Sequence, residues 1–346
     1  MIVSVTLSSI IPAIAGIPDV DSANWSTDPR AFGMSPREYI QAESRALFAD
    51  FISRAGVNTF YNFPGVAAAA DRFVVSPNND TVYSIAVVNV RDGFTLELPK
   101  VGDRFLSAQL IDENHMTPFY LYGGGSRTFT PDQFESNYVG VAIRVGTSAT
   151  EKDIRFVREH LQPQYRIVGA RQADDMARPD LNVLAKVRAA LVGEYSLLTS
   201  SAGAMQKRTD QVEDWEFFTY VTAGGWGLSA DENAMYAPYV LEGLKGNTCY
   251  TATYPPVPAK AFFSITVYGP EKYLMSDKDN LVSSNREIIT ESDGSFQVAF
   301  GGEPCRRLAP NYVYTPKDGW SLLLRNYRPD IELFKHYQMP ELIEVN

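Results

Sequence analysis

The fold class is set by residues 81–112, which read TVYSIAVVNVRDGFTLELPKVGDRFLSAQLID. β-Branched and aromatic residues fill 81–90, 94–98 and 104–112, and such runs predict three strands. Turn-forming Asp-Gly and Gly-Asp pairs separate the runs. Short strands at this spacing predict an antiparallel β-sandwich rather than a parallel α/β sheet.

Short strands separated by turns occur in two parts of the chain. The chain has 346 residues, which is long enough for two domains. We therefore expect a mainly β protein with two antiparallel β-sandwiches. In the first part, further strands are expected at residues 72–75, 117–122 and 140–145. In the second part, strands are expected at residues 250–254, 261–268, 295–300 and 321–327.

Helices are expected before and between the two sets of strands. Ser35 and Glu38 form a capping box with proline at the first helical position, which predicts a helix over 35–56. A second helix should begin at Thr150, and a third should span 181–198. The predicted organisation is an N-terminal tail at 1–34, a sandwich domain at 35–170, a largely helical connector at 171–246 and a second sandwich domain at 247–346.

The N-terminal tail carries a mostly apolar run at residues 2–17, in which Ala13-Ile14-Ala15 resembles a signal-peptidase site. Because no basic n-region precedes the run, two interpretations stay open: a truncated signal peptide, or a tail packed against the body. The first interpretation favours an exported or periplasmic protein. The run is too short, and too interrupted by Ser and Pro, to span a membrane.

The acidic composition disfavours nucleic-acid partners. The formal net charge is −10 and Lys and Arg form no cluster, whereas a phosphate backbone requires a basic patch. The two cysteines, Cys249 and Cys305, either form one disulfide or remain two buried thiols. The sequence does not indicate an oligomeric state.

Familiar catalytic and metal-binding motifs are absent from the sequence. The chain has three histidines but neither H-x-H nor H-E-x-x-H, and it has no C-x-x-C, G-x-S-x-G or G-x-G-x-x-G. We therefore expect no cofactor and no bound transition metal. Elemental analysis of the purified protein checks this prediction, and one equivalent of zinc, iron or copper would contradict it.

The first candidate site is the segment Asn78-Asn79-Asp80-Thr81. Asn and Asp side chains close Asx turns and tolerate left-handed backbone geometry, so a turn alone explains the motif. Two asparagines beside an aspartate exceed what one turn requires, and their amide and carboxylate groups suit a polar ligand. Both interpretations stay open.

The second candidate is Asp112, at the end of an apolar strand, with His115 three residues later. A carboxylate in this position is costly unless it is paired, and Arg104 or Arg127 is the expected partner. Alternatively, Asp112 and Asp80 lie at one rim, where a carboxyl with a raised pKa serves as general acid. His115 is then a proton shuttle or joins both acids around a hard cation; otherwise it is an ordinary surface histidine.

The third candidate combines an arginine with aromatic residues. Arg325 lies within a run of leucines, where it either pairs with a buried carboxylate or points into a cleft to bind an anion. Tyr268, Tyr327 and Trp226 either belong to the core or build an aromatic wall against which a sugar or apolar ligand stacks.

Several of these segments resemble one known pairing of families, domains of unknown function 1254 and 1214. The motif SPNNDTVY at 76–83 is similar to the signature of the first family, and its Tyr83 joins Asn78 and Asn79 among the candidate ligand-binding residues. The motif LLLRNY at 322–327 resembles the closing strand of the second family. The resemblance covers residues 35–340 and implies two sandwiches of jelly-roll type joined by helices.

Three functions are compatible with these residues. We expect first a binding module, or an enzyme without a cofactor, for a small polar or carbohydrate-like ligand such as a glycan, held in an aromatic-walled cleft. The first alternative is a lyase or hydrolase that uses Asp80, Asp112 and His115 as acid and base. The second alternative is a surface or interaction protein without a small-molecule site.

Strand topology decides whether the two acids meet. A simple meander of the strands at 81–90, 94–98 and 104–112 places Asp80 and Asp112 at opposite ends of the sheet. A jelly-roll crossing brings them to one rim. Since the family resemblance implies the crossing, we expect both acids in one cavity.

Overall fold

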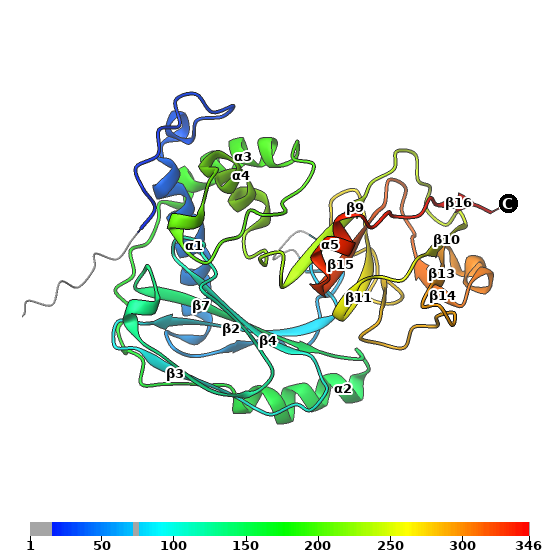
Figure 1. The fold of residues 1–346 in the computed structure, drawn as a ribbon, viewed down its shortest axis with the longest axis horizontal. Coiled ribbons are helices and arrows are strands. Elements are labelled where there is room, and N and C mark those ends of the chain that lie inside the picture. Colours follow the sequence, from blue (N-terminus) through cyan, green and yellow to red (C-terminus); the bar gives the residue numbers. More distant parts are fainter. Residues whose placement is uncertain (1–15, 72–75, 346) are drawn as a thin grey trace, which may run out of the picture.

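The computed structural model describes residues 16–71 and 76–345, which form two β-sandwiches lying side by side (Figure 1). The predictions for residues 1–15 and for a strand at 72–75 lie outside the described residues. The predicted fold class is confirmed: the chain is mostly β, with antiparallel sheets and a helical N-terminal segment. In the described part of the chain, no helix is long and apolar enough to cross a membrane.

The N-terminal sandwich packs a larger sheet, sheet A, against a smaller sheet, sheet B. Alternate residues such as Val82, Val141 and Leu96 point between the two sheets and form their common core. Sheet A has the order β1 (Tyr61–Asn62), β2 (Thr81–Asn89), β7 (Tyr138–Gly146), β4 (Leu106–Asp112), β5 (Phe119–Tyr122). Sheet B has the order β6 (Gly125–Phe129), β3 (Phe94–Leu98), β8 (Arg166–Val168).

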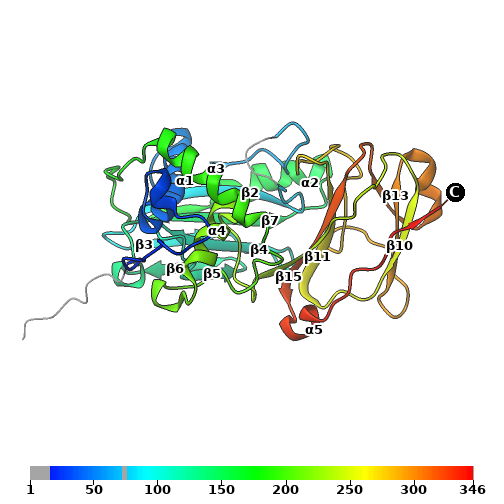
Figure 2. The same ribbon diagram turned by 90° about the horizontal axis from the view of Figure 1, so that it is seen from above.

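The C-terminal sandwich consists of sheets C and D, which form two layers in Figure 2. Ile265, Leu324 and Trp320 are buried between them. The described strands pair antiparallel except for β13 and β14, which are parallel. Sheet C has the order β12 (Leu281–Ser283), β11 (Ala259–Tyr268), β15 (Ser321–Pro329), β9 (Ala234–Tyr239). Sheet D has the order β14 (Asn311–Tyr314), β13 (Phe296–Gly301), β10 (Tyr250–Tyr254), β16 (Ile343–Glu344).

Helix α1 (Pro36–Ala55) packs on the face of sheet A that points away from sheet B (Figure 1). It begins at the predicted capping box, in which Glu38 N–H donates to Ser35 Oγ and Ser35 N–H donates to the Glu38 carboxylate. Phe48 of α1 lies over Gly140 of β7, where a Cβ atom would come within 2.7 Å of the ring. Glycine therefore permits the close approach of helix and sheet.

Apart from Pro29–Phe32, which precedes α1, the remaining helical segments lie between strands along the described chain, and α3 and α4 pack against α1. The other α-helices are α2 (Glu151–Phe156), α3 (Leu181–Tyr195), α4 (Trp215–Gly225) and α5 (Ile331–Lys335). A π-helical turn follows α2 at Val157–Leu161. Short 3₁₀ segments occur at Pro29–Phe32, Pro131–Gln133, Gln162–Gln164, Thr209–Gln211 and Glu303–Leu308.

The segment expected to be largely helical, 171–246, contains α3 and α4 but also the strand β9. This strand forms an edge of sheet C, where Ala234 pairs with Tyr327 and Tyr239 pairs with Leu322. The sequence analysis also missed the strands β6 and β14, of five and four residues, and strands of two or three residues such as β8, β12 and β16. Pairing with distant strands, rather than local composition, determines such short elements.

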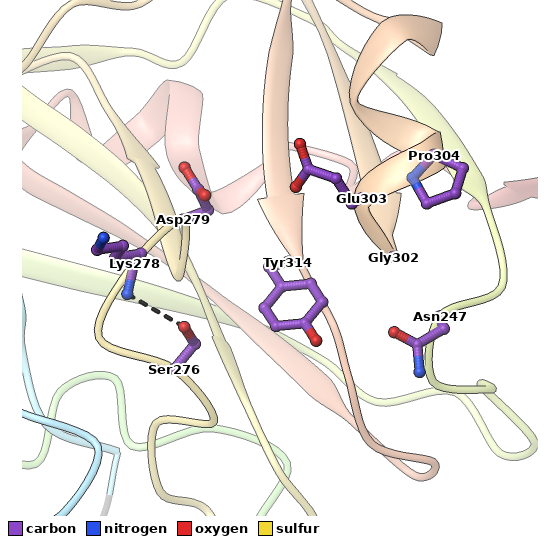
Figure 3. Close-up of a pocket in the computed structure, with 8 residues that line it drawn as sticks. All are labelled: Asn247, Ser276, Lys278, Asp279, Gly302, Glu303, Pro304 and Tyr314. Carbon is purple, nitrogen blue, oxygen red and sulfur yellow. Dashed lines mark hydrogen bonds between the residues drawn. The ribbon is translucent and has the colours of Figure 1, made fainter.

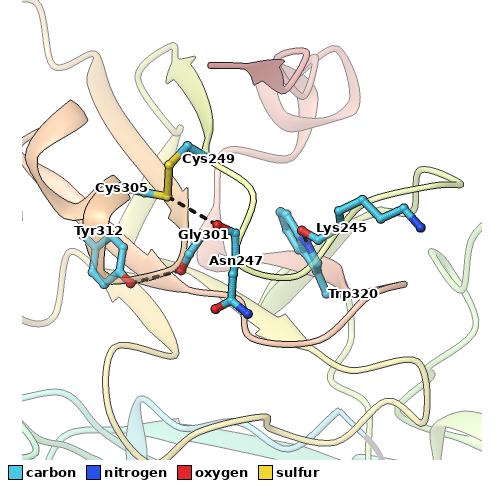
Figure 4. Close-up of a disulfide and its surroundings, with 7 residues drawn as sticks. All are labelled: Lys245, Asn247, Cys249, Gly301, Cys305, Tyr312 and Trp320. Atoms are coloured by element: carbon cyan, nitrogen blue, oxygen red, sulfur yellow. Dashed lines mark hydrogen bonds between the residues drawn. A yellow bond between two sulfur atoms is a disulfide. The ribbon is translucent and has the colours of Figure 1, made fainter. Parts of the chain in front are cut away.

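Cys249 and Cys305 form a disulfide with a Cα–Cα distance of 5.3 Å (Figure 4). The bond links the residue before β10 to the 3₁₀ segment that follows β13. Of the two interpretations of the cysteines, the disulfide is the one that the structure contains.

Candidate functional site

The candidate site begins with a row of polar residues on sheet A, on the face that points away from sheet B. Tyr83 of β2, Arg144 of β7, Ser107 of β4 and Tyr122 of β5 are paired across the four strands. Because paired residues in an antiparallel ladder share one face, these side chains stand side by side. The next row on the same face includes Gln109, which pairs with Tyr120.

Sheet C presents a matching row on the face that points away from sheet D. Arg325 of β15 lies between Ser264 of β11 and Tyr236 of β9. The neighbouring row contains Phe262 and Tyr327, whose rings stack with their centroids 4.1 Å apart. Polar and aromatic side chains thus cover this face of sheet C.

The two polar faces meet. The ring of Phe105, just before β4, lies 4.9 Å from that of Phe262 on sheet C, and Tyr122 Oη donates to Asn233 Oδ1 at 3.0 Å. Arg144 interacts electrostatically with Tyr236 across the junction. We name the residues at this junction the inter-sheet cluster: Asp80, Tyr83, Gln109, Tyr120, Arg144, Tyr236, Arg325 and Tyr327.

Asn78 and Asn79 hold the start of β2 at this junction. Asn78 Oδ1 accepts hydrogen bonds from the N–H groups of Asp80 at 2.6 Å and Thr81 at 3.3 Å, which is the predicted Asx turn. Its Nδ2 donates to Tyr327 Oη on sheet C. Asn79 Nδ2 donates to Asn280 Oδ1 at 2.9 Å. Both side chains therefore join the two sandwiches as well as shaping the turn.

Asp80 is fully buried at the junction. Its Oδ2 accepts a hydrogen bond from Ser264 Oγ at 2.5 Å, whereas Oδ1 has no partner among the described residues. Burial, together with the Asp80 carboxylate, raises the pKa of Tyr327 well above its ordinary value, so this phenol stays protonated.

Arg325 is 3% exposed and fixes the segment before the turn against sheet C. Its guanidinium donates to Ser76 O at 2.6 Å and to Thr266 Oγ1 at 3.2 Å, and it lies 5.6 Å from the ring centroid of Tyr268. Tyr268 Oη in turn donates to Pro77 O at 2.9 Å. The carboxylate partner considered for Arg325 is not formed, since no described acid lies within ion-pair distance of it.

The sequence analysis missed four members of the cluster, namely Gln109, Tyr120, Tyr236 and the charged residue Arg144. Arg144 is 9% exposed, its Nε donates to Tyr83 Oη at 3.1 Å, and its buried Nη1 has no partner among the described residues. The signal was present in the sequence, because Arg144 interrupts the apolar strand 138–146 just as Arg325 interrupts a run of leucines.

The tyrosines of the cluster remain partly accessible to solvent. Tyr83, Tyr120 and Tyr236 have intermediate exposure, whereas Gln109 beside them is fully buried. Gln109 Nε2 donates to Leu228 O at 2.9 Å, but its Oε1 has no partner within the described part of the chain. These three tyrosines of the cluster are therefore in contact with solvent.

Asp112 does not belong to this cluster. It pairs with Val139 at one end of β7, whereas Thr81, next to Asp80, pairs with Gly146 at the other end. At about 3.3 Å per residue, the two acids are roughly 25 Å apart along the sheet. The prediction that they share a cavity is wrong, because β2 and β4 flank β7 and run in the same direction.

The predicted ion pair of Asp112 with an arginine is also wrong. Arg104 instead pairs with Asp153 at 2.7 Å. Arg127 lies against the ring of Phe119, 5.7 Å from its centroid. Both arginines are thus engaged elsewhere on the N-terminal sandwich.

Asp112 is instead held by backbone donors. Its Oδ1 accepts hydrogen bonds from the N–H groups of Asn114 at 2.9 Å and Met116 at 3.0 Å, while its Oδ2 has no partner among the described residues. Burial raises the pKa of Asp112 to about 8, and the nearby carboxylates of Glu135 and Glu113 add to this shift. Asp112 is therefore protonated at neutral pH.

His115 is 1% exposed, so it is not the surface histidine that one interpretation expected. Its Nε2 accepts the N–H of Gly227 at 2.8 Å and its Nδ1 lies 2.9 Å from Thr222 Oγ1, which engages both ring nitrogens. Burial lowers its pKa to about 3. Both nitrogens of this neutral imidazole are therefore used in hydrogen bonds within the protein.

Trp226 packs with His115 and not with the tyrosines of sheet C. The two rings stack with centroids 5.3 Å apart, and Trp226 Nε1 donates to Ser44 Oγ of α1 at 3.1 Å. The aromatic rings at the junction are those of Phe105, Phe262 and Tyr327, which pack on one another.

Two further observations concern other sites. Over residues 16–71 and 76–345, no three His, Cys, Asp or Glu side chains gather closely enough to hold a metal ion.

A solvent-exposed hollow of about 550 Å³ lies beside β14, lined by residues such as Asp279, Glu303 and Tyr314 (Figure 3). It contains none of the predicted site residues, and Asp279 is already paired with Arg306 at 2.7 Å.

These features define a two-domain β protein whose sandwiches meet across a buried polar cluster. Residues 57–169 match the family described as "Protein of unknown function (DUF1254)", and residues 241–331 match "Protein of unknown function (DUF1214)". The two matches, in this order, confirm the pairing of families that the sequence resemblance predicted.

Solved structures show the same fold. The crystal structure of the VPA0106 protein from Vibrio parahaemolyticus superposes with a TM-score of 0.68 at 16% identity, covering 92% of this chain and 100% of that one. A protein from Burkholderia cenocepacia gives a TM-score of 0.52 at 13% identity, covering 89% of this chain and 87% of that one. A comparison with curated proteins gives no match.

Proposed function

We propose that this protein binds a small polar ligand between sheets A and C, at the inter-sheet cluster. The observation that carries the proposal is a set of three buried polar atoms without partners among the described residues: Asp80 Oδ1, Gln109 Oε1 and Arg144 Nη1. Buried polar atoms in folded proteins are almost always hydrogen-bonded, because an unpaired one loses its hydration without compensation. A bound ligand or ordered water supplies the hydrogen bonds that these three atoms lack.

The aromatic residues around these atoms favour a compact ligand with an apolar face. Tyr327 and Phe262 stack on each other, and Phe105 lies edge-on to Phe262. Such walls accept the flat faces of sugar rings, while the polar atoms orient hydroxyl groups. This combination supports a polar or carbohydrate-like ligand for the site.

The acid–base alternative loses its main support in this structure. An enzyme that uses Asp80 and Asp112 together requires both carboxyls within reach of one substrate, and the register of β2, β7 and β4 separates them. Of these two acids, only Asp80 belongs to the inter-sheet cluster. We therefore place ligand binding ahead of a paired-carboxylate mechanism.

A thermal-shift screen tests the proposal. The wild type is screened against small polar metabolites and oligosaccharides, and each compound that raises the melting midpoint is then titrated against Tyr236→Ala. Tyr236 lies on an edge strand facing the space between the sheets, so we expect its loss to weaken binding at least about tenfold.

Tyr314→Ala is the matched control, because Tyr314 is a half-buried tyrosine on sheet D that lines the hollow of Figure 3. Binding that survives in this variant but weakens in Tyr236→Ala supports the junction. The opposite result would place the ligand in the surface hollow, and an absence of stabilising compounds would favour an interaction protein without a small-molecule site.

A further inference from the structure

We infer that the ligand is a small hydroxylated carboxylate whose carboxylate group is bound by Arg144; this inference rests on the proposed function of the inter-sheet cluster. The argument starts from the state of Arg144 itself. A guanidinium remains charged at all relevant pH values, and Arg144 is 9% exposed with no described acid within ion-pair distance. Burying such a charge without a counter-ion is strongly unfavourable.

The free end of Arg144 has the geometry that carboxylates prefer. Its Nε is occupied by Tyr83 Oη, and no described residue accepts a hydrogen bond from its two terminal nitrogens. The terminal nitrogens of a guanidinium form a planar pair of donors that matches the two oxygens of a carboxylate. Arg144 thus presents an unused two-point donor to the space between the sheets.

Asp80, the acid of the cluster, does not neutralise Arg144. Its carboxylate is hydrogen-bonded to Ser264 and interacts electrostatically with Arg325 and Arg286. Arg286 also donates to Asn79 O at the same turn. Asp80 therefore already interacts with two guanidinium groups, and Arg144 adds a third positive charge to the cluster, which leaves a local excess of positive charge within a chain of net charge −10. An anion compensates this excess.

The other unpaired atoms indicate hydroxyl groups on the same ligand. Asp80 Oδ1 and Gln109 Oε1 are hydrogen-bond acceptors without donors in the described chain, so they suit groups that donate. The phenols of Tyr120 and Tyr236 both donate and accept, and both lie near Arg144. A ligand with a carboxylate that faces Arg144 and hydroxyls that face Asp80 and Gln109 supplies a hydrogen bond to each of the three unpaired atoms.

The first experiment compares matched ligands at equal ionic strength. The carboxylates glucuronate, gluconate, tartrate and lactate are titrated by thermal shift beside the neutral compounds glucose, glucitol, threitol and propane-1,2-diol, and beside sodium phosphate. We expect at least one carboxylate to raise the melting midpoint, with an apparent affinity at least about tenfold above that of its neutral partner. Equal or stronger stabilisation by phosphate would overturn the carboxylate assignment, and no response to any carboxylate would overturn the inference.

The second experiment uses Arg144→Met, which keeps an unbranched, flexible side chain but removes the guanidinium group and its charge. We expect loss of the carboxylate response, together with a melting midpoint of the ligand-free protein that rises by about 2 °C, because a desolvated, uncompensated charge has been removed. A fall in the ligand-free midpoint would show that the charge is compensated within the protein and would overturn the inference. Arg155→Met, on the exposed face of α2, is the control and should change neither quantity.

The two proposals fail in different ways. Binding of neutral polar compounds that is lost in Tyr236→Ala but unchanged in Arg144→Met retains the proposed function and rejects the carboxylate. Carboxylate binding that is unchanged in both variants rejects the inter-sheet cluster as the site.

Discussion

Removing the disulfide between Cys249 and Cys305 is expected to lower the free energy of unfolding by about 4 kcal/mol. The two cysteines are 56 residues apart in the sequence, and the loop that they close contains β10, β11, β12 and β13. The bond restricts the unfolded chain, so its loss raises the conformational entropy of that state. Denaturant unfolding of the double variant Cys249→Ala/Cys305→Ala, compared with the oxidised wild type, measures the effect.

The control is the wild type unfolded and refolded with its thiols reduced, which should show a similar loss. A double variant within about 1 kcal/mol of the wild type would contradict the prediction.

Because structural disulfides persist in oxidising compartments, we also propose that this protein is exported.

The second large effect is a fall in stability with rising pH, which we assign to Asp112. Its pKa is raised to about 8 in the folded protein from an ordinary value of 3.8. Between these values the folded protein holds a proton that the unfolded chain has lost, so stability decreases as pH rises. We expect a loss of about 1.4 kcal/mol per pH unit, or roughly 2 kcal/mol between pH 6.5 and 8.

His115 has the opposite effect at lower pH. Its pKa is lowered to about 3 from 6.5, so below pH 6.5 the unfolded chain binds a proton that the folded protein excludes. Stability from this group therefore decreases as pH falls from 6.5 towards 3. The contributions of His115 and Asp112 nearly cancel between pH 4 and 6.5, which confines the net effect of Asp112 to the higher range.

The variant Asp112→Asn isolates the contribution of this carboxyl group to the pH dependence of stability. The amide oxygen can still accept from the N–H groups of Asn114 and Met116, and the variant has no proton to lose. Urea unfolding at pH 6.5 and pH 8 should show the fall in the wild type and a nearly flat response in Asp112→Asn. Equal slopes in the two proteins would mean that groups other than Asp112 cause the dependence.

Local interactions explain why much of the fold was predictable. The capping box at Ser35 and Glu38 forms within four residues, so the start of α1 does not depend on the rest of the chain. The long strands β2, β4 and β7 are rich in β-branched and aromatic residues. Short strands such as β8 and β16 have no comparable pattern and exist because a longer strand pairs with them.

The candidate site was predictable only in pieces. Asn78, Asp80, Arg325 and Tyr327 were each identified from their residue types and positions, yet nothing local indicated that they would meet. Asn78 and Tyr327 are 249 residues apart in the sequence and directly hydrogen-bonded in the structure. Trp226, proposed for the same wall, lies with His115 instead.

The families, the mainly β class, the helix at 36–55 and the polar character of the turn before β2 are predictable from the amino-acid sequence, since these features depend on composition and on neighbours within a few residues. Which polar groups face each other depends instead on the tertiary structure. The order β2-β7-β4 placed Asp80 and Asp112 at opposite ends of one sheet. The packing of sheet A on sheet C left Arg144 buried without a counter-ion. Strand order and sheet packing arise from contacts between distant residues, and local patterns do not encode them.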